Sequence, residues 1–221
     1  SYTYFTWRNT KSEFIEYMTE LTRTEMREYF RPNFFTNTPD ILSPILQSGG
    51  PAAFKMRLVL AATLSPAYGV YSGYELCENQ AVPGTEEYEN SEKYEIKVRD
   101  WNRPGNIKDY ITRMNAIRAG NPALRQLTNL RFLVTDSDQI IMYVKASADM
   151  RNKILVAVNL DPFNPHECTV FVPPDAAGVT PGGRFQVTDL LTGNAWTWSE
   201  RNYVRLDPNV QPAHVFAISA A

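Results

Sequence analysis

Cysteine is scarce in this sequence, and it contains neither a long apolar segment nor an excess of basic residues. Two cysteines occur among 221 residues, Cys77 and Cys168, far apart and at no spacing typical of a zinc site. The pattern fits reduced thiols in a cytosolic protein, with a single disulfide as the alternative. The apolar stretch at residues 58–64 is too short to span a bilayer.

The charge balance excludes further classes of partner. Lys and Arg number 22 against 24 Asp and Glu, a net charge of −2. Without a basic field, we expect neither nucleic acid nor an anionic membrane as a partner. His166 and His214 have no further ligand at metal-binding spacing, and Gly49-Gly50 lacks the Lys-Ser/Thr of a phosphate loop. We therefore expect no metal, no organic cofactor and a cytoplasmic location.

The N-terminal segment has no initiator methionine and no signal-peptide core. Residues 2–7 alternate aromatic side chains with threonine, which predicts a β-strand. A strand at this position indicates a chain that begins inside a fold, as a piece of a longer protein would.

The first half alternates predicted strands and helices. Thr10 and Glu13 form a capping-box pattern that predicts a helix start. Repeated β/α units imply parallel strands with right-handed crossovers. Three parallel strands leave open edges, so we expect the missing strands from a longer chain or a second copy. The other predicted segments are strands at 33–35 and 68–71, helices at 52–64 and 107–118, and a polar loop at 72–105.

The second half consists of short β-prone runs separated by turn residues, which predicts an antiparallel β-sandwich. A boundary near residues 121–129 divides the chain into predicted domains at 1–126 and 127–221. The predicted strands lie at 131–134, 140–145, 154–159, 169–172, 185–190, 195–198, 203–206 and 215–218.

Asp40 is the sharpest single candidate for a functional residue. It ends the string Asn37-Thr38-Pro39-Asp40, just beyond the predicted strand at 33–35. The C-terminal end of a barrel strand is where active-site groups are placed, and a carboxylate there stabilises positive charge or orients hydroxyl groups. The same residues also fit a simple turn, with Pro39 restricting its neighbour to an extended conformation.

The long polar loop supplies the other candidates. Lys93 and Tyr94 offer a cation, a hydroxyl and a stacking face that suit a polyol or phosphate, although the residues alone favour a solvated loop. Glu75 and Glu78 fit two interpretations. As paired carboxylates they would serve as an acid and a base, whereas most acidic loop residues only contribute surface charge.

Several aromatic residues also have two interpretations. The function of Trp7, near the end of the first predicted strand, stays open, as does that of its neighbour Arg8. Trp196 and Trp198 share one strand face, where they either stack on glycan or pack the sandwich.

In order along the chain, these segments resemble the α-1,4-glucan:maltose-1-phosphate maltosyltransferases of the α-amylase clan. The most specific strings are Asn37-Thr38-Pro39-Asp40 and Ser91-Glu92-Lys93-Tyr94-Glu95. The resemblance implies that residues 1–126 form strands 6–8 of a TIM (β/α)8 barrel and that the tail forms the clan's C-terminal β-sandwich. Most amylase relatives have histidine immediately before this aspartate, Asp40 here. The proline at this position, Pro39, is similar to the maltosyltransferase branch.

The resemblance also implies roles for the candidate residues. Asp40 matches the carboxylate that binds donor-sugar hydroxyls and stabilises the oxocarbenium-like transition state, and Lys93 and Tyr94 match the pair that closes the donor site. The family's nucleophile and acid/base follow strands 4 and 5, which have no counterpart here. Retaining transfer needs both carboxyl groups about 5 Å apart, so we expect this chain alone to be inactive.

The implied activity is transfer of maltosyl units from maltose 1-phosphate to the non-reducing end of α-1,4-glucans, with retention. These two carbohydrates are the expected partners, together with a second copy or a complementary chain. Two alternatives stay open: an α-glucan hydrolase and a non-catalytic glycan-binding module.

Overall fold

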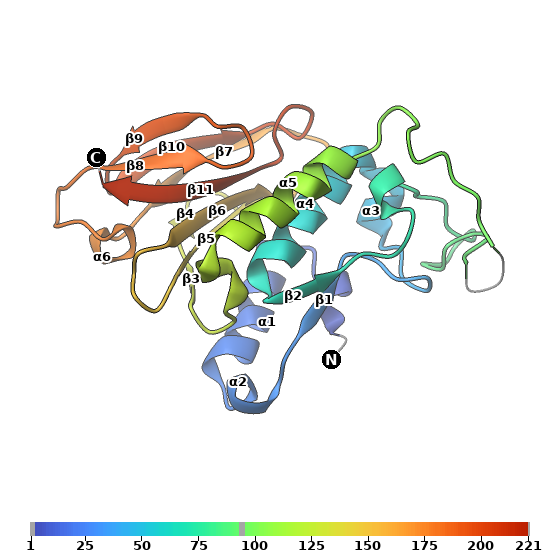
Figure 1. The fold of residues 1–221 in the computed structure, drawn as a ribbon, viewed down its shortest axis with the longest axis horizontal. Helices are drawn as coiled ribbons and strands as arrows, with labels where there is room; N and C mark the ends of the chain where they lie inside the picture. The colour runs from blue at the N-terminus through green and yellow to red at the C-terminus, as the bar shows by residue number, and fades with distance from the viewer. Residues whose placement is uncertain (1–2, 93–95, 221) are drawn as a thin grey trace.

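The computed structural model describes residues 3–92 and 96–220 of the chain. A helical region carrying a small parallel sheet lies beside two antiparallel sheets, and a long loop extends from the end farthest from those sheets (Figure 1). The first region contains η1 (Tyr4–Trp7), α1 (Lys11–Arg23), α2 (Met26–Tyr29), β1 (Asn33–Phe35), α3 (Pro44–Ser48), α4 (Gly50–Leu64), β2 (Ala67–Gly69), η2 (Tyr74–Leu76), α5 (Lys108–Gly120) and η3 (Pro122–Arg125).

The elements expected after residue 10 are present. Thr10 and Glu13 form the predicted capping box at the start of α1. β1 and β2 pair in parallel, with Phe34 opposite Tyr68, and α4 follows β1 as the main crossover helix. Two of the three predicted parallel strands are therefore confirmed.

The strand predicted at residues 2–7 is wrong for the part of it that the structure describes. Tyr4–Trp7 form a 3₁₀ helix instead. The guanidinium of buried Arg57 on α4 donates to the carbonyl oxygens of Thr6 (3.1 Å) and Arg8 (2.6 Å). A strand partner would need these same acceptors, and the Arg57 side chain already occupies them. No closed barrel is formed by residues 3–92 and 96–220.

The second half is antiparallel, as its turn-separated runs predict. One sheet has three strands in the order β10-β7-β4 and the other six in the order β3-β5-β6-β11-β8-β9. Buried side chains from both sheets form one shared core. The elements are β3 (Leu130–Phe132), β4 (Val134–Thr135), β5 (Ile140–Ala146), β6 (Lys153–Asn159), β7 (His166–Phe171), α6 (Pro174–Ala177), β8 (Phe185–Asp189), β9 (Ala195–Trp198), β10 (Arg201–Leu206) and β11 (Ala213–Ala220).

The six-stranded sheet is covered on both faces. Alternate residues of β5, such as Ile140 and Met142, face the core shared with the small sheet. Their neighbours Ile141 and Tyr143 belong to the core around α4, and the Tyr143 hydroxyl lies 2.5 Å from the Thr63 hydroxyl. The helical core therefore extends across residue 127, the start of the second predicted domain.

Two basic side chains bind the C-terminal carbonyl groups of α4. The amino group of buried Lys145 on β5 donates to the carbonyl oxygens of Thr63 (3.1 Å) and Gln126 (2.5 Å). Arg118 on α5 donates to Ala62, Ser65 and Pro66. The last carbonyl groups of a helix lack partners within it, so these hydrogen-bond donors join α4 to both of its neighbours.

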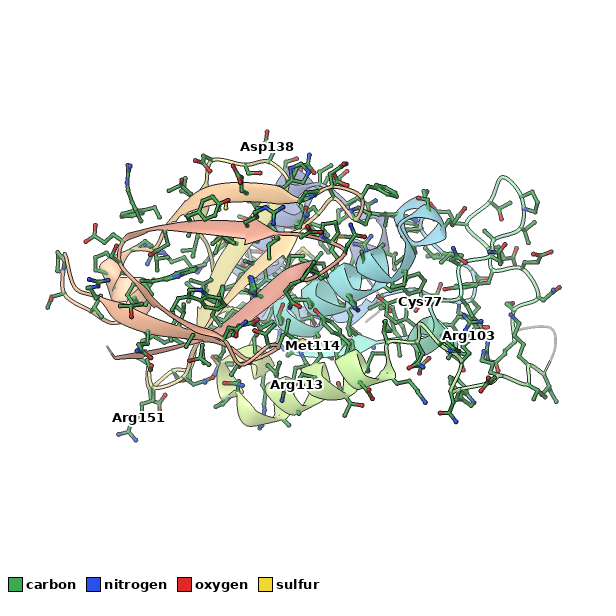
Figure 2. All side chains as sticks on the ribbon, turned by 90° about the horizontal axis from the view of Figure 1, so that it is seen from above. Cys77, Arg103, Arg113, Met114, Asp138 and Arg151 are labelled. Atoms are coloured by element: carbon green, nitrogen blue, oxygen red, sulfur yellow. The ribbon has the colours of Figure 1, made fainter. Side chains whose placement is uncertain are left out.

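The two cysteines are free thiols. Cys77 lies in the helical region near Arg103 (Figure 2), whereas Cys168 is on β7. In the described ranges, no helix has the length and apolar character needed to cross a bilayer.

Candidate functional site

The turn that carries Asp40 follows β1 directly. Thr38 and Ile41 form an isolated antiparallel bridge with two backbone hydrogen bonds of 3.1 and 3.2 Å. Pro39 and Asp40 occupy the two central positions, where the fixed φ of proline favours the first. Asp40 is exposed at the tip of this turn, so the turn interpretation and an accessible carboxylate are compatible.

The Asp40 turn is fastened to the loop that follows β2. The Tyr88 backbone N–H donates to the Pro39 carbonyl (3.2 Å), and the Leu42 N–H donates to the Glu86 carbonyl (2.6 Å). The Glu86 carboxylate also accepts a hydrogen bond from the Trp7 indole at 2.9 Å. The N-terminal segment, the Asp40 turn and the loop are therefore linked through Glu86.

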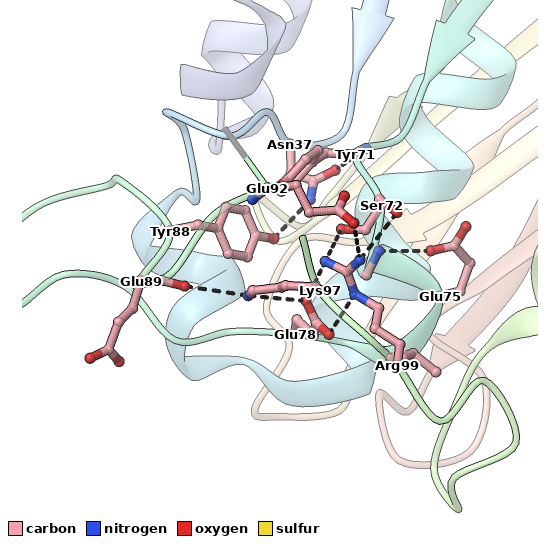
Figure 3. Close-up of polar contacts among 12 residues, drawn as sticks. Asn37, Tyr71, Ser72, Glu75, Glu78, Tyr88, Glu89, Glu92, Lys97 and Arg99 are labelled. Atoms are coloured by element: carbon pink, nitrogen blue, oxygen red, sulfur yellow. Dashed lines mark hydrogen bonds and ion pairs between the residues drawn. The ribbon is translucent and has the colours of Figure 1, made fainter. Parts of the chain in front are cut away.

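Asn37 joins the ends of the two parallel strands. Its buried amide donates to the Tyr88 hydroxyl at 2.7 Å, and its oxygen accepts from the Tyr71 backbone N–H at 2.9 Å. The Tyr71 and Tyr88 rings meet edge to face, with centroids 5.4 Å apart (Figure 3). Burial raises the pKa of Tyr88 well above its usual range, so its hydroxyl stays neutral.

Tyr71 also holds the segment that precedes the Lys93–Tyr94 pair. The backbone N–H of Glu92 donates to the Tyr71 hydroxyl at 2.8 Å. Lys93 and Tyr94 themselves lie outside the described residues. Within the described residues, the Asp40 turn and Glu92 are thus tied to one tyrosine pair.

Arg99 is the ionic centre of the loop, and 4% of its side chain is exposed. It binds Glu78 through two nitrogens (2.9 and 3.3 Å) and Glu92 through a third (2.7 Å), as Figure 3 shows. Although burial opposes the charge, these carboxylates raise the pKa of Arg99. Gly73 makes room for this cluster, because a Cβ there would lie 2.2 Å from the Glu78 carboxylate at a φ of +95°.

The remaining acidic candidates serve this loop. Glu78 pairs with Arg99, and the Glu75 carboxylate accepts from the Gly73 N–H at 3.1 Å. These contacts are structural rather than those of an acid and base acting on one bond. Nowhere in 3–92 or 96–220 do three His, Cys, Asp or Glu side chains gather as a metal site.

Sequence reasoning missed Asn37, Tyr71 and Arg99 as organising residues. Asn37 belonged to a singled-out string, but only the fold brings it to Tyr88, 51 residues away. A basic residue within an acid-rich loop was the available signal for Arg99. The described surroundings of Asp40 can present one exposed carboxylate, on a turn anchored to the loop, to a polyol.

Comparison with known proteins identifies relatives of nearly the whole chain. Residues 132–218 match the family model described as GLGE, C-terminal. The chain is 52% identical over 221 residues to the α-1,4-glucan:maltose-1-phosphate maltosyltransferase of Rhodospirillum rubrum, covering 99% of this chain and 32% of that protein. It is also 52% identical to maltosyltransferase 1 of Streptomyces coelicolor, covering 33% of it. The chain thus spans about a third of the length of these relatives.

Solved structures of α-amylases share the fold. The Geobacillus thermoleovorans α-amylase complexed with acarbose superposes with a TM-score of 0.69 at 14% identity, covering 95% of this chain and 43% of that one. An Anoxybacillus α-amylase gives a TM-score of 0.67, also at 14% identity, with coverages of 96% and 43%. At such low identity, the agreement concerns architecture only.

Proposed function

We propose that this region supplies the donor side of a maltosyl-transfer site. The chain corresponds to about the C-terminal third of the α-1,4-glucan:maltose-1-phosphate maltosyltransferases of the α-amylase family. The whole protein would move maltosyl units from maltose 1-phosphate to the non-reducing end of α-1,4-glucans, with retention. Its proposed location is the cytoplasm.

The observation that supports this proposal is the fixed position of an exposed carboxylate. Asp40 stands at the tip of a turn that the Tyr88 backbone holds, and the Tyr71 ring that packs on Tyr88 anchors Glu92 through its hydroxyl. An oxocarbenium-like transition state carries positive charge, which a preorganised carboxylate stabilises without reorganisation. We assign this role and the binding of donor hydroxyl groups to Asp40.

Lys93 and Tyr94 are proposed to close the donor site. They follow Glu92, whose carboxylate and backbone N–H are held by Arg99 and Tyr71. A lysine beside a donor sugar phosphate supplies charge, and a tyrosine supplies a hydroxyl and a stacking face.

The covalent steps require groups from elsewhere in the longer protein. Retaining transfer uses a nucleophile and an acid/base about 5 Å apart, and Asp40 is assigned neither role. We propose that β1 and β2 are strands 7 and 8 of a (β/α)8 barrel, with residues 1–126 in the barrel and 127–221 in a β-sandwich domain. The open edges of the β1–β2 sheet would then be covered by further barrel strands, or otherwise by a second copy.

A direct assay tests the proposed reaction. The full-length protein is supplied with maltose 1-phosphate and glycogen, and released phosphate and chain length are measured together. Phosphate release matched by chain extension supports transfer. The α-amylase-like architecture favours an α-glucan hydrolase as the second candidate. Reducing sugar formed from glycogen without maltose 1-phosphate would support that candidate and overturn the transferase.

A further inference from the structure

An aromatic groove opens between the edges of the two antiparallel sheets. Its volume is about 190 Å³, and it is built from elements other than those of the candidate site. The residues that line it include Trp196, Trp198, Val204, Arg205, His214 and Phe216. We call this feature the aromatic groove.

The aromatic groove exists because the small sheet covers the large one incompletely. β9 is an edge strand of the six-stranded sheet, and β10 is an edge strand of the three-stranded sheet. Trp196 and Trp198 share one face of β9, but Trp198 is 7% exposed whereas Trp196 is 41% exposed. The indole of Trp196 is therefore a partly uncovered part of an otherwise buried sheet face.

Neighbouring rings hold the Trp196 indole in place. Phe216 meets it at 90° and His214 at 64°, each with a centroid separation of 5.9 Å. Such edge-to-face contacts fix a ring without covering all of it. The aromatic groove therefore offers a rigid stacking surface.

A buried carboxylate orients the polar group beside this surface. Asp189 is 0% exposed and lies 2.9 Å from Nδ1 of His214. It also accepts hydrogen bonds from the Val215 N–H and the Thr192 hydroxyl. Burial opposes the charge, but these partners lower the pKa of Asp189, so the carboxylate is ionised and Nδ1 of His214 carries a proton. This contact fixes the orientation of the imidazole and involves only Nδ1, not the second ring nitrogen, Nε2.

Arg205 supplies donors on the opposite border, on β10. About half of its side chain (52%) is exposed, and its guanidinium lies 3.7 Å from Asp207. An aromatic face with an imidazole on one side and a guanidinium on the other suits an uncharged ring that carries both C–H faces and hydroxyl groups. A sugar has this combination of groups.

We propose that the aromatic groove binds a glucosyl unit of an α-glucan chain, with the sugar face stacked on Trp196. The identity of the sugar rests on the proposed function, whereas the groove itself does not. A second point of attachment on one polymer raises the local concentration of chain ends without any new contact at the candidate site.

Native electrophoresis in gels that contain glycogen tests this proposal without maltose 1-phosphate. We expect Trp196→Ala in the full-length protein to weaken retardation on the order of tenfold, as loss of a stacking platform predicts. Trp196→Phe should retain most of the binding because it keeps an aromatic face. Tyr29→Ala, at a 71% exposed tyrosine on α2, is the control and should migrate as the wild type.

The outcomes are decisive in either direction. Unchanged retardation of a folded Trp196→Ala protein overturns the proposal, as does a Trp196→Ala effect explained by dissociation of a dimer in sedimentation. If Trp196→Ala fails to fold, Arg205→Ala decides, with roughly threefold weaker retardation expected and no change contradicting the groove. A protein that binds glycogen through Trp196 but releases no phosphate from maltose 1-phosphate would instead overturn only the proposed function.

Discussion

The side-chain amide of Asn37 donates a hydrogen bond to the Tyr88 hydroxyl at 2.7 Å, and both residues are buried. This contact joins the end of β1 to the loop after β2, and the backbone of the same tyrosine holds the Asp40 turn. The position of the candidate carboxylate therefore depends on a hydrogen bond between residues far apart in the sequence.

Tyr88→Phe should destabilise the protein by about 1–2 kcal/mol, because it removes the acceptor of a buried amide. Urea unfolding of the full-length protein measures the change. Tyr29→Phe removes a hydroxyl from an exposed residue and serves as the matched control. Equal unfolding midpoints for Tyr88→Phe and the control would contradict the structural role of this bond.

Asp40→Asn should lower the rate of phosphate release from maltose 1-phosphate by at least about 100-fold, since a preorganised charge is lost from the transition state. The residue is exposed, so the unfolding midpoint should change far less than the rate. Asp138→Asn, an exposed aspartate elsewhere on the surface, is the control (Figure 2). A variant of Asp40 with wild-type rates would remove it from the proposed mechanism.

Arg99→Met should loosen the loop rather than unfold the protein. It leaves Glu78 and Glu92 without their shared cation, and a nearly buried cation network is costly to break. Amide hydrogen exchange at residues 89–92 and 96–100 should accelerate at least about tenfold. Arg113→Met, at an exposed site on α5, should leave these rates unchanged. Protection retained in Arg99→Met would show that other contacts hold the loop.

The buried amine of Lys145 should make the free energy of unfolding depend on pH. Burial, followed by the nearby charge of Arg118, lowers its pKa from 10.5 to about 7. The neutral amine can still donate to the carbonyls of Thr63 and Gln126. Between the two pKa values the unfolded chain binds more protons, so stability rises with pH across this window and is lost as the pH falls toward 7.

The comparison of wild type with Lys145→Met isolates this effect, because both proteins share all other titrating groups. Between pH 7 and 9, the free energy of unfolding of the wild type should gain up to about 1.4 kcal/mol per pH unit relative to the variant. Lys108→Met, whose ammonium contacts Asn102 at the surface, should follow the wild-type curve. Parallel curves for wild type and Lys145→Met would show that the buried amine does not titrate in this range.

The β-rich half was largely predictable because its strands are local signals. The predicted strand at 195–198 has the same bounds as β9, and Pro or Gly breakers separate most of its neighbours. The order of strands in the sheets is not local, so periodicity could not supply it. The capping box at Thr10 was predictable for the same reason, since its bonds join adjacent residues.

The N-terminal segment shows where local preference fails. Alternating aromatic and threonine residues favour a strand, but a strand also needs a partner for its backbone groups. Arg57 provides that partner from 49 residues away, and no sequence pattern around Arg57 predicts this contact. Asn37 and Arg99 were overlooked for the same physical reason, because their partners become neighbours only after folding.

The double coverage of β5 and β6 limits how this region can be transplanted. Residues such as Ile141, Tyr143, Val156 and Val158 would become solvent-facing in a piece cut out at residue 127. Such a piece would expose a continuous hydrophobic surface and would tend to aggregate. Transfer of the sandwich to another enzyme would first require polar substitutions on that face, or retention of α4 to keep it buried.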